Sequence, residues 1–140
     1  GYKSRPKEVI AVEERETIRL SDSEWRVMEE LWTAPSTLME LVRTLGNKAG
    51  WAKSTVATVL RRMEAKGLVT YEEGGKARIY HPALRREDAA LAETRSLLHR
   101  AYHGSVGLMM SALVKGGSLK PEELEELQAI LREAERGRVT

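Results

Sequence analysis

The stretch WAKSTVATVLRRMEAKGLVTYEEGGKARIYHP, residues 51–82, decides the fold. Its first half carries four apolar residues at helical spacing: Val56, Val59, Leu60 and Met63. This periodicity predicts a helix over about residues 53–66 that ends at Gly67. Strand-forming residues then flank Gly74-Gly75, which predicts a β-hairpin with its turn at the two glycines. A helix followed by a hairpin is the second half of a winged helix-turn-helix.

Two more helices are expected upstream of this stretch. Residues 21–24 (SDSE) and 37–40 (TLME) both have the spacing of a capping box, which marks the start of a helix. Apolar residues follow each box at helical spacing, and Gly46-Asn47 is expected to end the second helix. Three short helices and a hairpin therefore predict a winged helix-turn-helix over residues 19–84.

Residues 85–137 carry helical signals only. We expect one long helix from about Arg86 to His103, a second up to Val114 and a third that begins at Pro121. Apolar side chains recur along all three helices, and we expect a second copy of the chain to cover them because large apolar faces are rarely left in water. The predicted homodimer contacts are Leu91, Leu98, Tyr102, Val106, Met109, Met110, Leu113, Leu124, Leu127, Ile130 and Leu131.

The predicted fold class is thus mainly α with a small β wing. Three segments are expected: an N-terminal tail over residues 1–18, with one short strand or helix at most, the winged helix-turn-helix at 19–84 and a helical dimerisation domain at 85–137. The charged first residues and the lack of an apolar run of about 20 residues predict a cytoplasmic protein with no membrane insertion.

Charge is distributed unevenly along the chain. The net charge is only +2, yet residues 51–86 hold eight basic groups against three acidic ones, and residues 119–136 hold three against six. The basic segment includes the predicted third helix and the hairpin. This distribution favours a surface that meets phosphate groups.

The outer face of the third helix carries the residue types that read DNA. Its polar side presents Ser54, Thr55, Thr58, Arg61 and Arg62, and the hairpin adds Lys76 and Arg78. A helix fits the major groove, where short hydroxyls approach base edges and arginines reach guanine or the backbone, while a wing places cations beside the neighbouring backbone. Two alternatives remain open: a winged-helix module that binds a protein, and a ligand-sensing winged-helix regulator of another class.

Other chemistry finds little support in the sequence. The chain has no cysteine, which excludes disulfides, thiolate zinc sites and thiol redox sensing. His99 and His103 have a spacing that suits a metal, but no further ligands accompany them, so we expect no metal. No phosphate-binding loop, nucleophile elbow or dinucleotide fingerprint occurs, and we therefore expect neither a cofactor nor an enzyme.

The segments LSDSEWRVMEELW, WAKSTVATVLRRMEAKGLV, ARIYHP and LKPEELEELQAIL together resemble the penicillinase-repressor family (BlaI/MecI/CopY) over about residues 19–136. The resemblance implies a DNA-binding transcriptional repressor with a winged helix, a helical dimerisation domain and a palindromic operator as its double-stranded DNA partner. By position it implies that Lys53 lies near phosphate, that Arg78 belongs to the wing, and that the groove is faced by Ser54, Thr55, Ala57, Thr58 and Arg62.

The chain departs from the family in its induction signals. In the penicillinase and methicillin-resistance repressors, a membrane sensor-protease pathway leads to cleavage of an Asn-Phe bond, and that position is Ala112-Leu113 here. The copper-responsive branch carries a C-terminal Cys-x-Cys pair, which this cysteine-free chain lacks. The resemblance therefore covers operator binding and leaves the inducing signal open.

Overall fold

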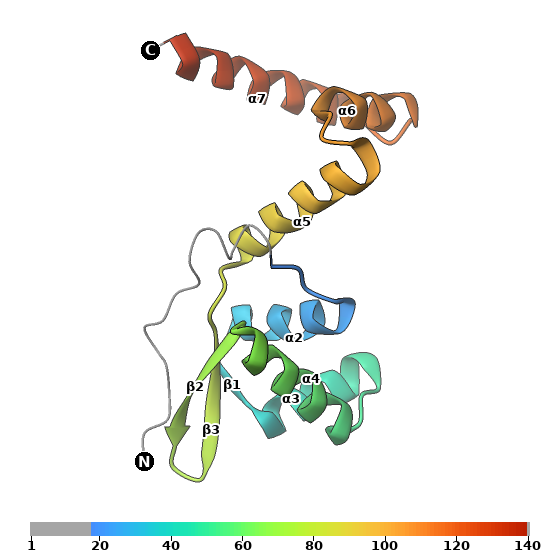
Figure 1. Ribbon diagram of the computed structural model, residues 1–140. Helices are drawn as coiled ribbons and strands as arrows, with labels where there is room; N and C mark the ends of the chain where they lie inside the picture. Colours follow the sequence, from blue (N-terminus) through green and yellow to red (C-terminus); the bar gives the residue numbers. More distant parts are fainter. Residues whose placement is uncertain (1–17, 140) are drawn as a thin grey trace. The chain divides into compact units, whose positions relative to one another are not determined.

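The computed structural model describes residues 18–139, so the predicted tail lies outside the described residues except for Ile18. The chain divides into two compact units, one ending at Arg95 and the other beginning at Ser96 (Figure 1). The elements of the first unit are α2 (Asp22–Thr33), β1 (Ser36–Thr37), α3 (Leu38–Ala49), α4 (Lys53–Lys66), β2 (Val69–Gly74), β3 (Ala77–Pro82) and the start of α5 (Arg86–Tyr102).

Both predicted capping boxes are confirmed. In α2, the Ser21 hydroxyl accepts from the Glu24 amide at 3.2 Å, and the Glu24 carboxylate accepts from the Ser21 amide at 2.8 Å. Thr37 and Glu40 make the same pair of bonds at the start of α3. Because each box satisfies two backbone amides that a helix start leaves unpaired, the two helices begin where the sequence predicts.

The predicted end of α3 at Gly46-Asn47 is wrong. The helix continues to Ala49 and ends at Gly50, whose φ of 70° is the left-handed conformation that suits glycine. The Gly50 amide donates to the Gly46 carbonyl at 3.0 Å, so Gly46 lies inside the helix. Glycine costs only about 1 kcal/mol in a helix interior, and one more helical turn offsets that cost.

The core of the first unit lies among α2, α3, α4 and the hairpin. The four apolar residues of α4 that the sequence singles out are all buried, as predicted, and α4 ends at Gly67 with a φ of 78°. Leu31 from α2 and Leu41 and Leu45 from α3 pack into the same cluster. Helices α2 and α3 thus cover one side of α4 and leave its other side outside the core (Figure 1).

The sheet differs from the prediction in two details. Its strand order is β1-β3-β2, with both pairings antiparallel, and β1 was not predicted because its two residues are bound by pairing with Tyr80 and Ile79, far along the chain. Gly74 pairs with Ala77, so the hairpin turn is Gly75-Lys76 and not Gly74-Gly75. Gly75 has a φ of 75°, which supplies the positive φ that a two-residue hairpin turn needs.

Residues of α2 hold the start of α5. The Trp32 indole N–H donates to the Leu84 carbonyl at 2.8 Å. The Arg86 guanidinium forms two hydrogen bonds with the Glu29 carboxylate, at 2.9 and 2.6 Å, and lies 4.8 Å from the centre of the Trp32 ring. With Ala89 also buried, the first turns of α5 belong to the winged-helix unit.

The second unit contains the rest of α5, α6 (Val106–Lys115) and α7 (Pro121–Val139). The long helix ends at Tyr102, because His103 and Gly104 have positive φ values of 51° and 84°. From Ser96 to Arg138 no side chain is buried. This unit therefore has no core of its own among the residues that the structure describes. Within the same residues, no helix is both long and apolar enough to cross a membrane.

Glu24 links the start of α2 to the end of α4 and makes folding sensitive to acid. Its buried carboxylate accepts from the Lys66 ammonium at 2.7 Å. Burial raises the pKa of Glu24, but the hydrogen bonds from Lys66 and Ser21 and the positive charge of Lys66 outweigh it, so the pKa lies below the ordinary 4.5. A lowered carboxyl pKa stabilises the fold above the unfolded-state value, and this stabilisation is lost as the pH falls through the folded-state value.

We therefore expect Glu24→Gln to lower the free energy of unfolding at pH 7 by about 1–3 kcal/mol, since the substitution removes a charged hydrogen-bond partner of Lys66. Below the ordinary pKa of 4.5 the difference from the unmodified protein should shrink. Urea unfolding followed by tryptophan fluorescence between pH 7 and pH 3 measures it. Glu40→Gln, in the exposed capping box of α3, is the control and should cost less. A difference that stays constant with pH would contradict the role of the Glu24 charge.

Candidate nucleic-acid interface

The polar face of α4 is open to solvent. Ser54, Thr55, Thr58, Arg61 and Arg62 are exposed, and Ala57 is half-buried beside them. The arrangement follows from the apolar face of the same helix, because a helix that buries positions 56, 59, 60 and 63 must turn the intervening positions outward. Three short hydroxyl residues therefore lie in the early turns of α4 and two arginines lie in its later turns.

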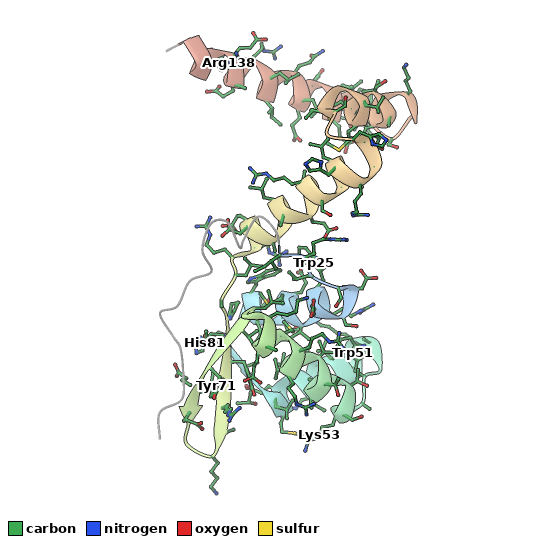
Figure 2. The ribbon with its side chains drawn as sticks, viewed as in Figure 1. Trp25, Trp51, Lys53, Tyr71, His81 and Arg138 are labelled. Carbon is green, nitrogen blue, oxygen red and sulfur yellow. The ribbon has the colours of Figure 1, made fainter. Side chains whose placement is uncertain are left out.

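The N-terminus of α4 differs from those of α2 and α3. Its N-cap residue is Ala52, which has no side chain that can accept a hydrogen bond. The first amides of α4 consequently lack a side-chain acceptor, and such a helix start favours an anion. Lys53, the first residue of α4, adds a full positive charge there. Figure 2 shows Lys53 at the lower edge of the first unit, the edge that the β2–β3 turn reaches in Figure 1.

Trp51 lies in the turn between α3 and α4. Its side chain is half-buried and packs against the core, and its amide donates to the Leu45 carbonyl at 3.2 Å. These contacts stabilise the turn that joins the two helices (Figure 2). Trp51 therefore positions the start of α4.

The two cations of the wing have different surroundings. Lys76 is exposed in the hairpin turn and makes no ion pair with any described residue. Arg78 lies on β3 with its guanidinium carbon 4.1 Å from the centre of the Tyr71 ring. Its Nη1 is 3.9 Å from a Glu64 oxygen, and its Nε is 3.8 Å from a Glu73 oxygen. A hydrogen bond with Tyr80 is the main cause that raises the pKa of Arg78 above its ordinary value.

The basic side chains of this surface therefore fall into two groups. Within residues 18–139, one group has no carboxylate partner: Lys53, Arg61, Arg62 and Lys76. Arg78 alone makes up the other group. The sequence analysis did not single out the partners of Arg78. Glu73 pairs directly with Arg78 only in the observed register, because a turn at Gly74-Gly75 would have placed Tyr71 opposite Arg78; Glu64 comes from another element.

The residues predicted for dimerisation are mostly exposed. Those with accessible side chains are Leu91, Val106, Leu113, Leu124, Ile130 and Leu131, with Ile130 at 55% and Leu131 at 63% exposure. The others are half-buried: Leu98, Tyr102, Met109, Met110 and Leu127. Three further apolar side chains that were not among the predicted contacts are also exposed: Leu97 on α5 and Leu108 and Val114 on α6. Ala112 and Leu113, at the position of the family's cleavage bond, lie exposed in the same helix.

The two histidines considered for a metal do not lie on one regular helix. His99 belongs to α5, whereas His103 follows the end of that helix with a φ of 51°. Among the described residues, no group of three or more histidine, cysteine, aspartate or glutamate side chains could hold a metal ion.

Comparison with known proteins gives a consistent result. A family model described as penicillinase repressor matches residues 20–133. The chain is 29% identical over 116 residues to the "Penicillinase repressor" of Bacillus licheniformis, covering 82% of this chain and 91% of that protein. It is 31% identical over 122 residues to the "Transcriptional regulator BlaI" of Mycobacterium tuberculosis, covering 85% and 87%.

A solution structure of the DNA-binding domain of the repressor BlaI is similar to half of the chain. Its TM-score is 0.48 at 26% identity, and the match covers 51% of this chain and 89% of that domain. The family model, in contrast, spans both units and includes α2 to α6 and most of α7. The resemblance that the sequence motifs indicate is thus confirmed, and the chain belongs to the penicillinase repressor family.

Proposed function

We propose that this chain is a transcriptional repressor that binds a palindromic operator as a homodimer, with α4 in the major groove and the wing beside the adjacent backbone. The observation that carries this proposal is the outer face of α4. It combines exposed hydroxyls with arginines that have no carboxylate partner among the described residues. Relatives named as repressors and transcriptional regulators support the same function.

We assign some residues of α4 to contacts with DNA base edges and others to contacts with the DNA backbone. Ser54, Thr55, Ala57 and Thr58 are short enough for the helix to approach base edges closely, and Arg62 is long enough to reach a guanine edge. Lys53 lies at the uncapped start of α4, where a phosphate would meet both its ammonium and the helix amides. Arg61 and the wing cations Lys76 and Arg78 complete the basic surface.

The proposed homodimer follows from the second unit. A unit in which no described side chain is buried gains little from apolar contacts by itself, and small domains without a core need a partner. Its exposed leucines, valines and isoleucine lie on α6 and α7. A second copy is the partner always present with this chain, and two-fold pairing places two recognition helices on the two halves of a palindrome. The proposal does not include cleavage at Ala112-Leu113, because this pair differs from the family's Asn-Phe.

The first test measures the salt dependence of operator binding. If Lys53, Arg61 and Lys76 of both protomers neutralise about six phosphates, log K should fall with log salt with a slope of about −5. Gel shift or fluorescence anisotropy with a palindromic site from upstream of the chain's own gene measures the slope, with random duplex DNA as the control. Weak and salt-independent binding to both duplexes would contradict DNA binding and favour a protein-binding module.

The second test concerns specificity. Arg62→Ala should weaken binding to the operator by about 1–3 kcal/mol, because it removes a direct base contact. It should change binding to random DNA much less. Lys53→Ala is the matched control on the same helix and should weaken both duplexes alike, since phosphate contacts carry no sequence information. If Arg62→Ala left the ratio of the two affinities unchanged, Arg62 would not be a base-reading residue.

The third test concerns assembly. Leu131→Asp places a charge on the most exposed apolar side chain of α7, so it should separate the protomers without unfolding the first unit. We expect a monomer at micromolar concentration in sedimentation experiments and the loss of most operator affinity. Ala129→Asp, beside the acidic side chains of the same helix, is the matched control and should leave the dimer intact. A monomeric unmodified protein that still binds the palindrome tightly would overturn the proposed assembly.

A further inference from the structure

Arg78, on β3, is surrounded by side chains from three elements. Glu64 comes from α4, Tyr71 and Glu73 come from β2, and Tyr80 comes from β3 itself. Arg78 is directly opposite Glu73 in the antiparallel register, so the ion pair of 3.8 Å across the strands follows from the fold of the hairpin. The Glu64 and Glu73 side chains are 29% and 34% exposed, which keeps both pairs partly out of water.

The contact with Glu64 has a particular place in the fold. Among residues 18–139, the ion pair between Arg78 and Glu64 is the one that joins α4 to the hairpin. The other ion pair of α4, between Lys66 and Glu24, joins α4 to α2. Leu68, just before β2, Val69 and Thr70 of β2, and Tyr80 of β3 are buried. Nearer the turn, Glu73, Lys76 and Ala77 are exposed. Nearer its turn, the hairpin is linked to α4 by the ion pair between Arg78 and Glu64, at 3.9 Å.

We propose that Arg78 is a positioning residue, which braces the wing against the recognition helix through Glu64 and Tyr71, and that Lys76 makes the phosphate contact of the wing. This inference rests on the proposed operator binding and divides the roles of its two wing cations. Each contact of an exposed arginine is weak by itself. Acting together, they hold the hairpin at one distance from α4 and neutralise two carboxylates that would otherwise repel phosphate.

The choice of arginine at position 78 fits this role. A planar guanidinium stacks on an aromatic ring through its face while its edge reaches carboxylates, and a lysine ammonium cannot do both. A phosphate contact, in contrast, needs only a flexible positive charge, which Lys76 supplies at the turn without an ion pair to any described residue. The same distinction provides the test.

The experiment measures the operator affinity of the full chain over a salt series for three variants. Arg78→Lys keeps the charge, so a phosphate contact would survive, whereas a brace would be lost; we expect affinity for the operator to fall about 3- to 10-fold with an unchanged salt slope. Glu64→Gln combined with Arg78→Gln removes one charge of each sign and should behave in the same way. Lys76→Ala is the matched control and should make the slope shallower by about 2 for the dimer, which is two phosphates at about 0.9 each.

A second measurement uses the free protein and separates this inference from the proposed function. The Nε–H resonance of Arg78, assigned by its absence in Arg78→Lys, should be shifted by the Tyr71 ring and should exchange slowly with water before any DNA is added. Addition of operator should leave it nearly unchanged. An unmodified protein that does not prefer the palindrome would overturn the proposed function. If Arg78→Lys binds the operator with normal affinity and the double variant Glu64→Gln, Arg78→Gln has a shallower salt slope, the positioning role of Arg78 would be wrong. The proposed operator binding would still stand.

Discussion

The burial of one face of α4 is the constraint on which the rest of the first unit depends. Val56, Val59, Leu60 and Met63 fill the space between α2 and α3 and are almost completely excluded from water. Once these four positions are fixed inside, helical geometry leaves no freedom for the positions between them. The hydroxyls and arginines of α4 must face solvent, and the hairpin begins at the C-terminal end of the same helix, after Gly67. The packing that stabilises the fold therefore also creates the candidate interface.

The charged side chains of the first unit are divided between support and recognition. Lys66 binds the buried Glu24, and Arg86 binds Glu29 while it lies over Trp32; both pairs connect separate elements. The cations that we assign to DNA contact have no carboxylate partner among the described residues. An exposed cation without a partner costs little in water, and it can bind phosphate without first breaking an ion pair. Arg78 lies beside this surface but is bound as the supporting cations are.

The second unit differs from the first because its helices have no buried side chains among the described residues. Its helices are regular and end at clear signals, such as the positive φ values of His103 and Gly104. Nevertheless, none of its described side chains from Ser96 to Arg138 is buried. Regular helices with uncovered apolar faces are what a protomer shows when the contacts that complete it belong to another copy. The first unit thus folds around its own core, whereas the described part of the second unit has none, and in the proposed homodimer a second copy would supply it.

Local sequence signals determined much of this protein. The capping boxes, the glycine after α4, the period of the apolar residues and the family motifs are all encoded within a few residues, because helix starts, helix ends and amphipathic faces depend on near neighbours along the chain. The hairpin turn and the end of α3 are local, but the sequence offers two glycines at each, and the structure uses Gly75 and Gly50. Tertiary structure decided the rest. Strand β1 and the pairing of Arg78 with Glu64 arise where separate segments meet. The energy of such a contact depends on two distant parts of the chain coming together in space, and no local pattern contains that information.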